Sequence, residues 1–341
     1  MKKEDLARSF KVWIPRIIAF GAIFIFMAIM EQSFFSTSNF IEIIRSVSVY
    51  GVMSCGMLFV VLIGGLDLSM GAMAGLCASI MFVIAQNGAN SLSATLLGFV
   101  VALAVALAVG WLHGFFITTL KIPFFVVTLA TKYILYGAIP LVTAGKYVYV
   151  RGGSPIDKIG TSRIFDTIPI LVVYFVIIAL VTWFILNKTV FGRRIYAIGG
   201  NPTAAGFVGI KVFKNTNIAY MLCTTAACIG GVILAANNQQ AGTTTGNAYE
   251  GMVLMAMIVG GINLAGGQGT VSGVVFGALI IGLIQNLVTF MSWGDYLKLV
   301  QGAIILIVVI VSVVTHTRSM RGKGRKGRKL LAKVKAEAQD E

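Results

Sequence analysis

The stretch VFGRRIYAIGGNPTAAGFVGIKV, residues 190–212, is the longest polar interruption between two long apolar runs of this 341-residue chain. It contains no acidic residue, and five basic residues lie in or beside it: Lys188, Arg193, Arg194, Lys211 and Lys214. Its backbone is broken by three glycines, Gly199, Gly200 and Gly209. Asn201-Pro202 is typical of a turn or helix start, and Thr203 to Val208 are long enough for one or two helical turns. Either a solvated loop or a short helix that serves as a docking surface fits this pattern.

The composition around this stretch is that of a membrane protein. Hydrophobic residues make up 57% of the chain and charged residues only 11%, with a mean hydropathy of +0.91, whereas soluble proteins carry about 25% charged residues. Many apolar runs reach the roughly 18 residues that span a bilayer. They do not alternate as the strands of a transmembrane barrel do. The sequence therefore predicts an all-α polytopic membrane protein with about ten transmembrane helices, some of them discontinuous at glycine-rich breaks.

The predicted spans are spread along the whole chain. They are residues 14–30, 43–63, 68–85, 94–120, 123–144, 168–186, 217–236, 252–262, 271–291 and 296–314. The eleven residues of 252–262 are too short to span, at about 1.5 Å each, so an extension from Tyr249 or a re-entrant path must complete them. We expect a basic N-terminus (residues 1–13), a membrane domain (14–315) with the loop 188–214, and a basic tail (316–341).

Charge placement orients these spans. Twenty of the 27 Lys and Arg residues lie before or in the first turn of the first span, at Lys121, in the central loop or in the tail. One topology puts all of them in the cytoplasm, with both termini inside and loops 145–166 and 237–250 outside. The four basic residues of loop 145–166 fit this rule poorly, so a misdrawn pair of spans stays open. The basic tail suits anionic lipid headgroups better than nucleic acid.

A weak internal repeat links two of the breaks. Gly64-Gly65-Leu66-Asp67-Leu68 recurs as Gly260-Gly261-Ile262-Asn263-Leu264, and a small-xxx-small pair follows each, Gly71/Gly75 and Gly273/Gly277. Broken segments at corresponding places in two halves point to a transport pathway, although glycines that only improve helix packing remain the alternative. The candidate pathway residues are Gly64, Gly65, Asp67, Ser69, Gly260, Gly261, Asn263, Gln285 and Asn286.

Ionisable residues inside the predicted spans are few. Asp67 is placed to cap a helix beginning at Leu68 or to bond across the pathway. Lys132 lies near the middle of its span and needs a partner, water or a route to the interface. His113 and His316 are isolated and predict no metal site. The sequence has no nucleotide-binding, metalloprotease or Ser-His-Asp motif, which argues against an enzyme.

Four blocks carry a resemblance: LIGGLDLSMGAMAGL (62–76), KIPFFVVTLAT (121–131), FGRRIYAIGGNPTAAGFVGIKV (191–212) and IVGGINLAGGQGTVSGVVFGALIIG (258–282). In order and spacing they resemble the ribose/xylose-type permeases of bacterial ATP-binding-cassette sugar importers. The resemblance implies a multi-pass protein of the plasma (inner) membrane, a homodimer or heterodimer with a second permease subunit. It also implies an extracytoplasmic sugar-binding protein and a cytoplasmic two-domain ATPase that binds ATP and Mg, so that this chain holds no cofactor.

In that family the central loop is the segment that couples to the ATPase. The residues matching it are Gly192, Arg193, Arg194, Gly199, Gly200, Asn201, Pro202, Ala204, Ala205, Phe207 and Gly209. The resemblance predicts that Ala204, Ala205 and Phe207 enter a groove on the ATPase. Gly206-Phe207 replaces a pair that is often basic or polar, which leaves the details of this pairing open. Lys132 replaces a residue that is usually apolar, so we expect Lys132→Met to be tolerated.

A different class of function is also open. A self-sufficient secondary transporter or facilitator for a small polar solute would have similar spans. A proton-coupled carrier usually has several acidic or histidine residues in its spans, and here Asp67 is the one serious acidic candidate. The sugar itself is not specified by the sequence, and pentoses, hexoses and related polyols all fit.

Overall fold

The computed structural model describes residues 32–150 and 152–291, together with residues 20, 21, 24–29, 299 and 302. The chain divides into two units, Met1–Gly294 and Asp295–Glu341, and the helices and strands with defined bounds lie in the first. Much of the predicted first span, 14–30, lies outside the described residues. So do nearly all of the predicted last span, 296–314, and the basic N-terminus and tail.

The described part is built almost entirely of helices. They are η1 (Gln32–Phe35), α2 (Thr37–Leu62), α3 (Met70–Asn87), α4 (Leu92–Thr118), α5 (Phe124–Thr143), α6 (Pro155–Thr161), α7 (Ile170–Lys188), α8 (Val190–Gly200), α9 (Pro202–Phe207), α10 (Val212–Asn238), α11 (Tyr249–Val259) and α12 (Val271–Phe290). Four two-residue strands join them: β1 (Val148–Tyr149), β2 (Arg163–Ile164), β3 (Ile168–Pro169) and β4 (Gln240–Ala241).

Seven of these helices are long and apolar enough to cross a membrane: α2, α3, α4, α5, α7, α10 and α12. They coincide with seven of the ten predicted spans, and the all-α membrane class is confirmed. The helix at the predicted span 252–262 is α11, which has eleven residues and a length of about 16 Å. It is too short to cross alone, as the sequence indicated.

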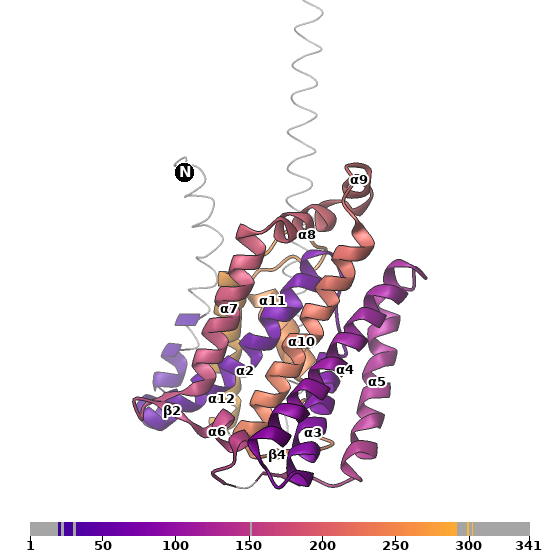
Figure 1. Cartoon of the computed structure of the whole chain (residues 1–341). Helices are drawn as coiled ribbons and strands as arrows, with labels where there is room; N and C mark the ends of the chain where they lie inside the picture. The colour runs from indigo at the N-terminus through magenta and orange to yellow at the C-terminus, as the bar shows by residue number, and fades with distance from the viewer. Residues whose placement is uncertain are drawn as a thin grey trace, which may run out of the picture. The chain divides into compact units, whose positions relative to one another are not determined.

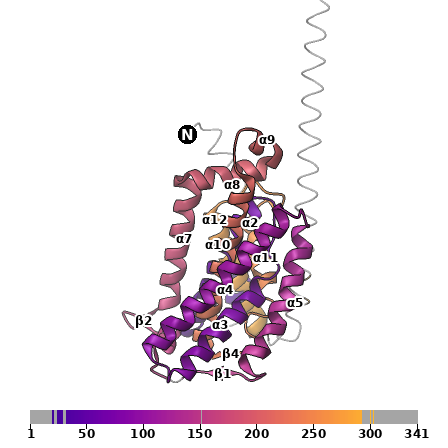
Figure 2. The same ribbon diagram turned by 45° about the vertical axis from the view of Figure 1, so that its right-hand side comes forward.

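The helices form an inner and an outer group. α2, α3 and α10 are buried along 83%, 72% and 72% of their most apolar stretches, whereas α4, α5 and α7 are buried along only 22%. The outer helices expose Leu, Val, Ile and Phe side chains along their length, as expected of surfaces that face lipid. Figures 1 and 2 show α10 and α2 in the interior with α4, α5 and α7 around them.

The two ends of the helices differ in structure. At one end, called here the α8–α9 end, α7 ends and α10 begins (Figure 1). At the opposite end, the β1–β4 end, Val148 pairs antiparallel with Ala241 and Tyr149 with Gln240. This small sheet and α6 pack on the outer halves of α3 and α10 through a buried apolar cluster that includes Phe82, Ile156 and Ala241. β2 and β3 pair beside it.

Candidate functional site

The two breaks of the sequence repeat meet in space. The first break, residues 63–69, joins α2 to α3, and the second, residues 260–270, joins α11 to α12. The amide of Gly267 in the second break donates a 2.8 Å hydrogen bond to the carbonyl of Leu62, the last residue of α2. The backbone of Gly266 lies against Gly64 in the first break. The structure thus brings together the two segments that the repeat singled out.

Helix α8 lies directly on the end of α2, where the first break begins, and on the second break. At Gly199 there is no room for a side chain, because a Cβ atom would overlap the carbonyl oxygen of Leu62 and the amide nitrogen of Gly267. The hydroxyl of Tyr196 donates a 2.8 Å hydrogen bond to the carbonyl of Gly269 in the second break. Gly200, the next residue, faces open space. A displacement of α8 must therefore be transmitted to the backbone of both breaks.

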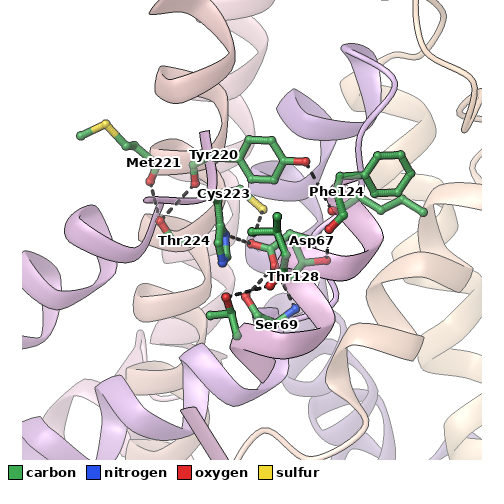
Figure 3. A network of polar contacts seen from close by, with 12 residues as sticks. Asp67, Ser69, Phe124, Thr128, Tyr220, Met221, Cys223 and Thr224 are labelled. Atoms are coloured by element: carbon green, nitrogen blue, oxygen red, sulfur yellow. Dashed lines mark hydrogen bonds and ion pairs between the residues drawn. The ribbon is translucent and has the colours of Figure 1, made fainter. Parts of the chain in front are cut away.

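Asp67 is the buried acid of the first break. Its Oδ1 accepts hydrogen bonds from the backbone amide of Ser69 at 2.9 Å and from the Ser69 hydroxyl at 2.6 Å (Figure 3). Both side chains are fully buried. Helix α3 begins at Met70 with Ser69 as its N-cap, and the Ser69 side chain makes no capping bond. Asp67 therefore closes the turn that precedes α3. The helix itself begins two residues later than the predicted start at Leu68.

Helices α4 and α10 enclose the second carboxylate oxygen. Oδ2 of Asp67 lies 3.6 Å from Nδ1 of His113 and accepts a weak 3.7 Å hydrogen bond from the Cys223 thiol. The ring of His113 packs edge-on against Tyr220, whose hydroxyl donates to the carbonyl of Leu66 at 3.5 Å. Figure 3 shows the Cys223 thiol of α10 directed toward Asp67, with Tyr220 of the same helix next to it. The break is thus tied to two spanning helices.

Sequence reasoning missed His113, which it treated as isolated. The signal was its spacing: Ala102, Ala106 and Gly110 precede it at intervals of four, four and three residues, and all of these are buried. Small residues at helical spacing mark the face that packs on a neighbouring helix, and His113 is on that face. Among the described residues, no group of three or more His, Cys, Asp or Glu is placed to hold a metal ion.

A cavity of about 180 Å³ lies beside this network. It is bounded by the first break, by the ends of α4 and α10 that face it, and by Ile198 and Pro202 of the α8–α9 connection. Gly64, Gly65 and Tyr220 line it. The first break and the α8–α9 connection therefore have space between them on this side.

Of the remaining predicted pathway residues, Asn263 lies in the second break, whereas Gln285 and Asn286 lie elsewhere. Asn263 holds its own turn, accepting from the amide of Ala265 at 3.1 Å and donating to the carbonyl of Gly266 at 3.3 Å. Gln285 accepts from the hydroxyl of Tyr50, and Asn286 donates to Asn39 at 2.6 Å. Gln285 is fourteen residues from the start of α12, about 21 Å along its axis. The structure does not bring Gln285 and Asn286 to the breaks.

Gly260 and Gly261 begin the second break. A Cβ at Gly260 would overlap the carbonyl oxygen of Gly273 in α12. Gly261 has φ of +70°, the left-handed region that glycine adopts at the end of a helix. These two residues therefore end α11 and allow α12 to pack against that end.

Comparison with known proteins identifies the family. The model of a family described as "Branched-chain amino acid transport system / permease component" matches residues 39–309. The chain belongs to this permease family. The ribose import permease of Bacillus subtilis is 33% identical over 296 residues, 84% of this chain and 88% of that protein. The L-arabinose transport system permease of Escherichia coli is 31% identical over 295 residues, 86% of this chain and 88% of that protein.

A third relative matches over more of the permease. The galactose/methyl galactoside import permease of Haemophilus influenzae is 29% identical over 341 residues, 93% of this chain and 97% of that protein. No solved structure gives a significant match. The chain is a multi-pass membrane permease.

The central loop of the permease is two helices, α8 and α9. Thr189 caps α8, accepting from the amide of Gly192 at 3.2 Å, and Asn201 caps α9, accepting from the amide of Ala204 at 3.0 Å. Most of the predicted coupling residues are exposed on these two helices and the turn after them: Arg193, Arg194, Gly200, Asn201, Pro202, Ala204, Phe207 and Gly209. The stretch is therefore two short helices rather than an irregular loop. Its role as a docking surface stays a prediction.

Two predicted coupling residues are buried within the permease. Gly192 packs against the last turn of α7, where a Cβ would overlap the carbonyl of Leu186. Ala205 is only 4% exposed, so the expectation that its side chain enters a groove on a partner is wrong for this conformation. The exposed apolar pair is instead Phe207 and Val208, at 88% and 77%.

Proposed function

We propose that this permease is the membrane subunit of an ATP-driven importer in the bacterial plasma (inner) membrane. ATP and Mg would be bound by a separate two-domain ATPase that docks on α8 and α9. The contact of α8 with the end of α2 and with the second break carries the proposal: Gly199 leaves no gap to Leu62 and Gly267, and Tyr196 is bonded to Gly269. A partner that moves α8 can therefore act on both halves of the repeat together.

The charge distribution supports a cytoplasmic α8–α9 end. In the part of the chain that the structure describes, exposed basic residues gather there without a nearby acid: Lys121, Lys188, Arg193, Arg194, Lys211 and Lys214. At the β1–β4 end the exposed bases Lys146, Lys158 and Arg163 are accompanied by Asp157 and Asp166. By the positive-inside rule the first end is cytoplasmic, with both termini on that side. A membrane-impermeant maleimide added to intact cells should label a cysteine at Thr167 and spare one at Thr203; the opposite pattern would reverse this orientation.

The substrate class we infer is a neutral sugar. The relatives named above are described as permeases for ribose import, L-arabinose transport and galactose/methyl galactoside import, while the family description names branched-chain amino acids. An amino acid zwitterion carries two charges that need partners away from water. Asp67 already faces His113 and Ser69, and Lys132 lies 2.6 Å from Glu250. Asp67, Lys132 and Glu250 thus already have partners within the bundle, which favours an uncharged substrate.

Reconstitution tests the whole proposal. The permease would be placed in liposomes with its ATPase, and with the extracytoplasmic binding protein added outside. We expect uptake of a pentose or hexose that needs ATP and all three components, with no uptake of leucine. Uptake by the permease alone, down a sugar gradient and without ATP, would overturn the importer and establish a facilitator. We also propose that a second permease subunit is part of the importer, and cross-linking in the same liposomes would show whether it is present.

A further inference from the structure

Lys132 is paired with a residue far away in sequence. It lies near the middle of α5, and its Nζ is 2.6 Å from Oε1 of Glu250, the second residue of α11. The side chains are 23% and 11% exposed. The ammonium also lies 6.0 Å from the centre of the Tyr136 ring. The partner that Lys132 requires inside its span is therefore Glu250, which sequence reasoning placed in an external loop.

Glu250 ends a polar segment that enters the bundle. This inserted segment, residues 242–250 with the sequence GTTTGNAYE, connects β4 at the β1–β4 end to the start of α11. Its backbone at Thr245 and Gly246 packs on Gly75 and Gly71 of α3. Gly71 is sixteen residues from the end of α3 at Asn87, or about 24 Å along the helix axis. The segment therefore reaches much deeper than an external loop would.

Three contacts hold the inserted segment. On one side it fits the glycines of α3 so closely that a Cβ at Gly71 would overlap the carbonyl of Gly246 and Oε2 of Glu250. On the other side the hydroxyl of Tyr136 donates to the carbonyl of Gly246 at 3.4 Å. The third contact is the ion pair from Lys132. Glu250 is thus fixed between α3 and α5.

An irregular backbone at membrane depth must be buried in protein or must line a water-filled path. Thr243, Thr244 and Asn247 of the inserted segment are exposed, and none is charged. The Thr244 hydroxyl lies 2.9 Å from the hydroxyl of Tyr147. Exposed hydroxyl and amide groups next to an aromatic residue can exchange hydrogen bonds with a polyol. They suit the passage of an uncharged sugar.

We propose that Lys132 and Glu250 are a positioning pair that holds the inserted segment in place. Thr243, Thr244 and Asn247 then form a polar wall of the sugar path on the β1–β4 side. This inference rests on the proposed function for its substrate, and on the geometry alone for the positioning. It reverses the expectation that Lys132→Met is tolerated, because that change leaves the Glu250 carboxylate buried and unpaired.

Uptake kinetics in the reconstituted importer test the pair. Lys132→Met should lower the maximal rate of uptake at least tenfold, and Glu250→Gln should lower it similarly. The double variant Lys132→Met/Glu250→Gln, which leaves no unpaired charge, should recover most of the loss. Lys146→Met, an exposed lysine at the β1–β4 end, is the matched control and should match the wild type. Wild-type uptake by Lys132→Met, or no recovery in the double variant, would overturn the pair.

A second readout does not need uptake. All four native cysteines are buried, and each would be replaced so that Asn247→Cys is the one thiol. Adding Lys132→Met to this variant should change the rate at which a polar maleimide labels the cysteine at position 247 by at least threefold. An equal labelling rate with and without Lys132→Met would overturn the positioning role. This readout needs no sugar transport, so it tests the pair separately from the proposed function. In the active importer, labelling Asn247→Cys should block uptake and the sugar should slow the labelling; unaffected uptake would overturn the polar wall.

Discussion

The backbone of Gly199 in α8 lies so close to the carbonyl oxygen of Leu62 that no side chain fits between them. Leu62 ends α2, the most buried of the spanning helices. The same glycine touches Gly267, which donates its amide to Leu62. At this point three segments far apart in sequence therefore meet through their backbones. Because a backbone contact has no rotamers to absorb movement, α8 and the two breaks are expected to move as one body.

Gly199→Ala should uncouple the permease. The added methyl group must push α8 away from Leu62 and Gly267, since neither backbone atom can turn aside. We expect normal insertion, sugar uptake reduced at least tenfold, and more ATP hydrolysed per sugar transported. Gly200→Ala is the matched control, because it adds the same methyl group one residue away into open space. Equal uptake by the two variants would contradict the close contact.

Much of the fold was predictable from sequence because lipid imposes a simple rule. An apolar run of spanning length must be a helix, since its backbone groups have no water to bond. Seven such runs are helices in the structure. The repeat was also informative, because Gly64 and Gly266 lie in breaks that touch. Helix starts were less predictable: α2 begins at Thr37, where Ser36 caps it, rather than at residue 43.

What the sequence did not reveal are contacts across long separations. Lys132 and Glu250 are 118 residues apart, and Asp67 meets His113 because α4 packs on α10 beside the break. No local pattern identifies either partner, although the small residues before His113 mark the face on which it lies. Ala205 was misjudged for a related reason: a six-residue helix has no long apolar periodicity to show which face is buried. Phe207, two residues later, is apolar and exposed and is therefore the better candidate for a contact with a partner.

Replacements of Asp67 should separate its hydrogen bonds from its charge. Asp67→Asn retains an oxygen that accepts from Ser69, and loses the negative charge beside His113. Asp67→Leu leaves the buried Ser69 amide and hydroxyl without an acceptor, at about 1–3 kcal/mol for each unsatisfied group. We therefore expect partial uptake from the first variant and little from the second, measured at equal expression. Normal uptake by Asp67→Leu would show that the turn tolerates its loss.

The β1–β4 end should weaken in acid because of Asp157. The backbone amide of Gly153 and the side chain of Gln239 donate to its carboxylate, at 2.7 Å each, and hold the pKa of Asp157 below its ordinary value. A carboxyl group whose pKa is lower in the folded protein than in the unfolded protein stabilises the folded form. This stabilisation is complete at pH values above the pKa of the unfolded state, about 3.9. That contribution is lost as the pH falls through the folded pKa.

Hydrogen exchange of residues 153–161 in the purified permease measures this effect. Protection factors, which are corrected for the intrinsic exchange rate, should be constant from pH 7 to pH 5 and fall below about pH 4. Asp157→Asn should lower them at neutral pH and remove the fall in acid. Asp166→Asn, in an exposed position of the same loop, should behave as the wild type. A fall that persists in Asp157→Asn would assign it to another group.

Phe207 should be the main apolar anchor for the ATPase. Its side chain is 88% exposed at the end of α9, at the basic end of the permease. Large exposed aromatic residues that become buried on binding carry much of the binding energy of an interface. Replacing Phe207 with Ala should cost about 1–3 kcal/mol of association, or roughly a five- to 150-fold rise in Kd. Replacing Arg193 with Ala should raise the Kd less, and by an amount that depends on salt, because charges at the rim of an interface contribute mainly to the rate of association.

The control for Phe207 lies at the opposite end of the permease. Phe165 precedes β3 in the loop after β2 and is 89% exposed, so Phe165→Ala removes the same ring from an equally open position. Co-purification in detergent should show that Phe207→Ala loses the ATPase while Phe165→Ala retains it. Equal retention by both variants would exclude α9 as the anchor. Loss with both would indicate that an exposed ring supports the permease itself rather than the contact, and the docking surface would then have to be sought on α8 alone.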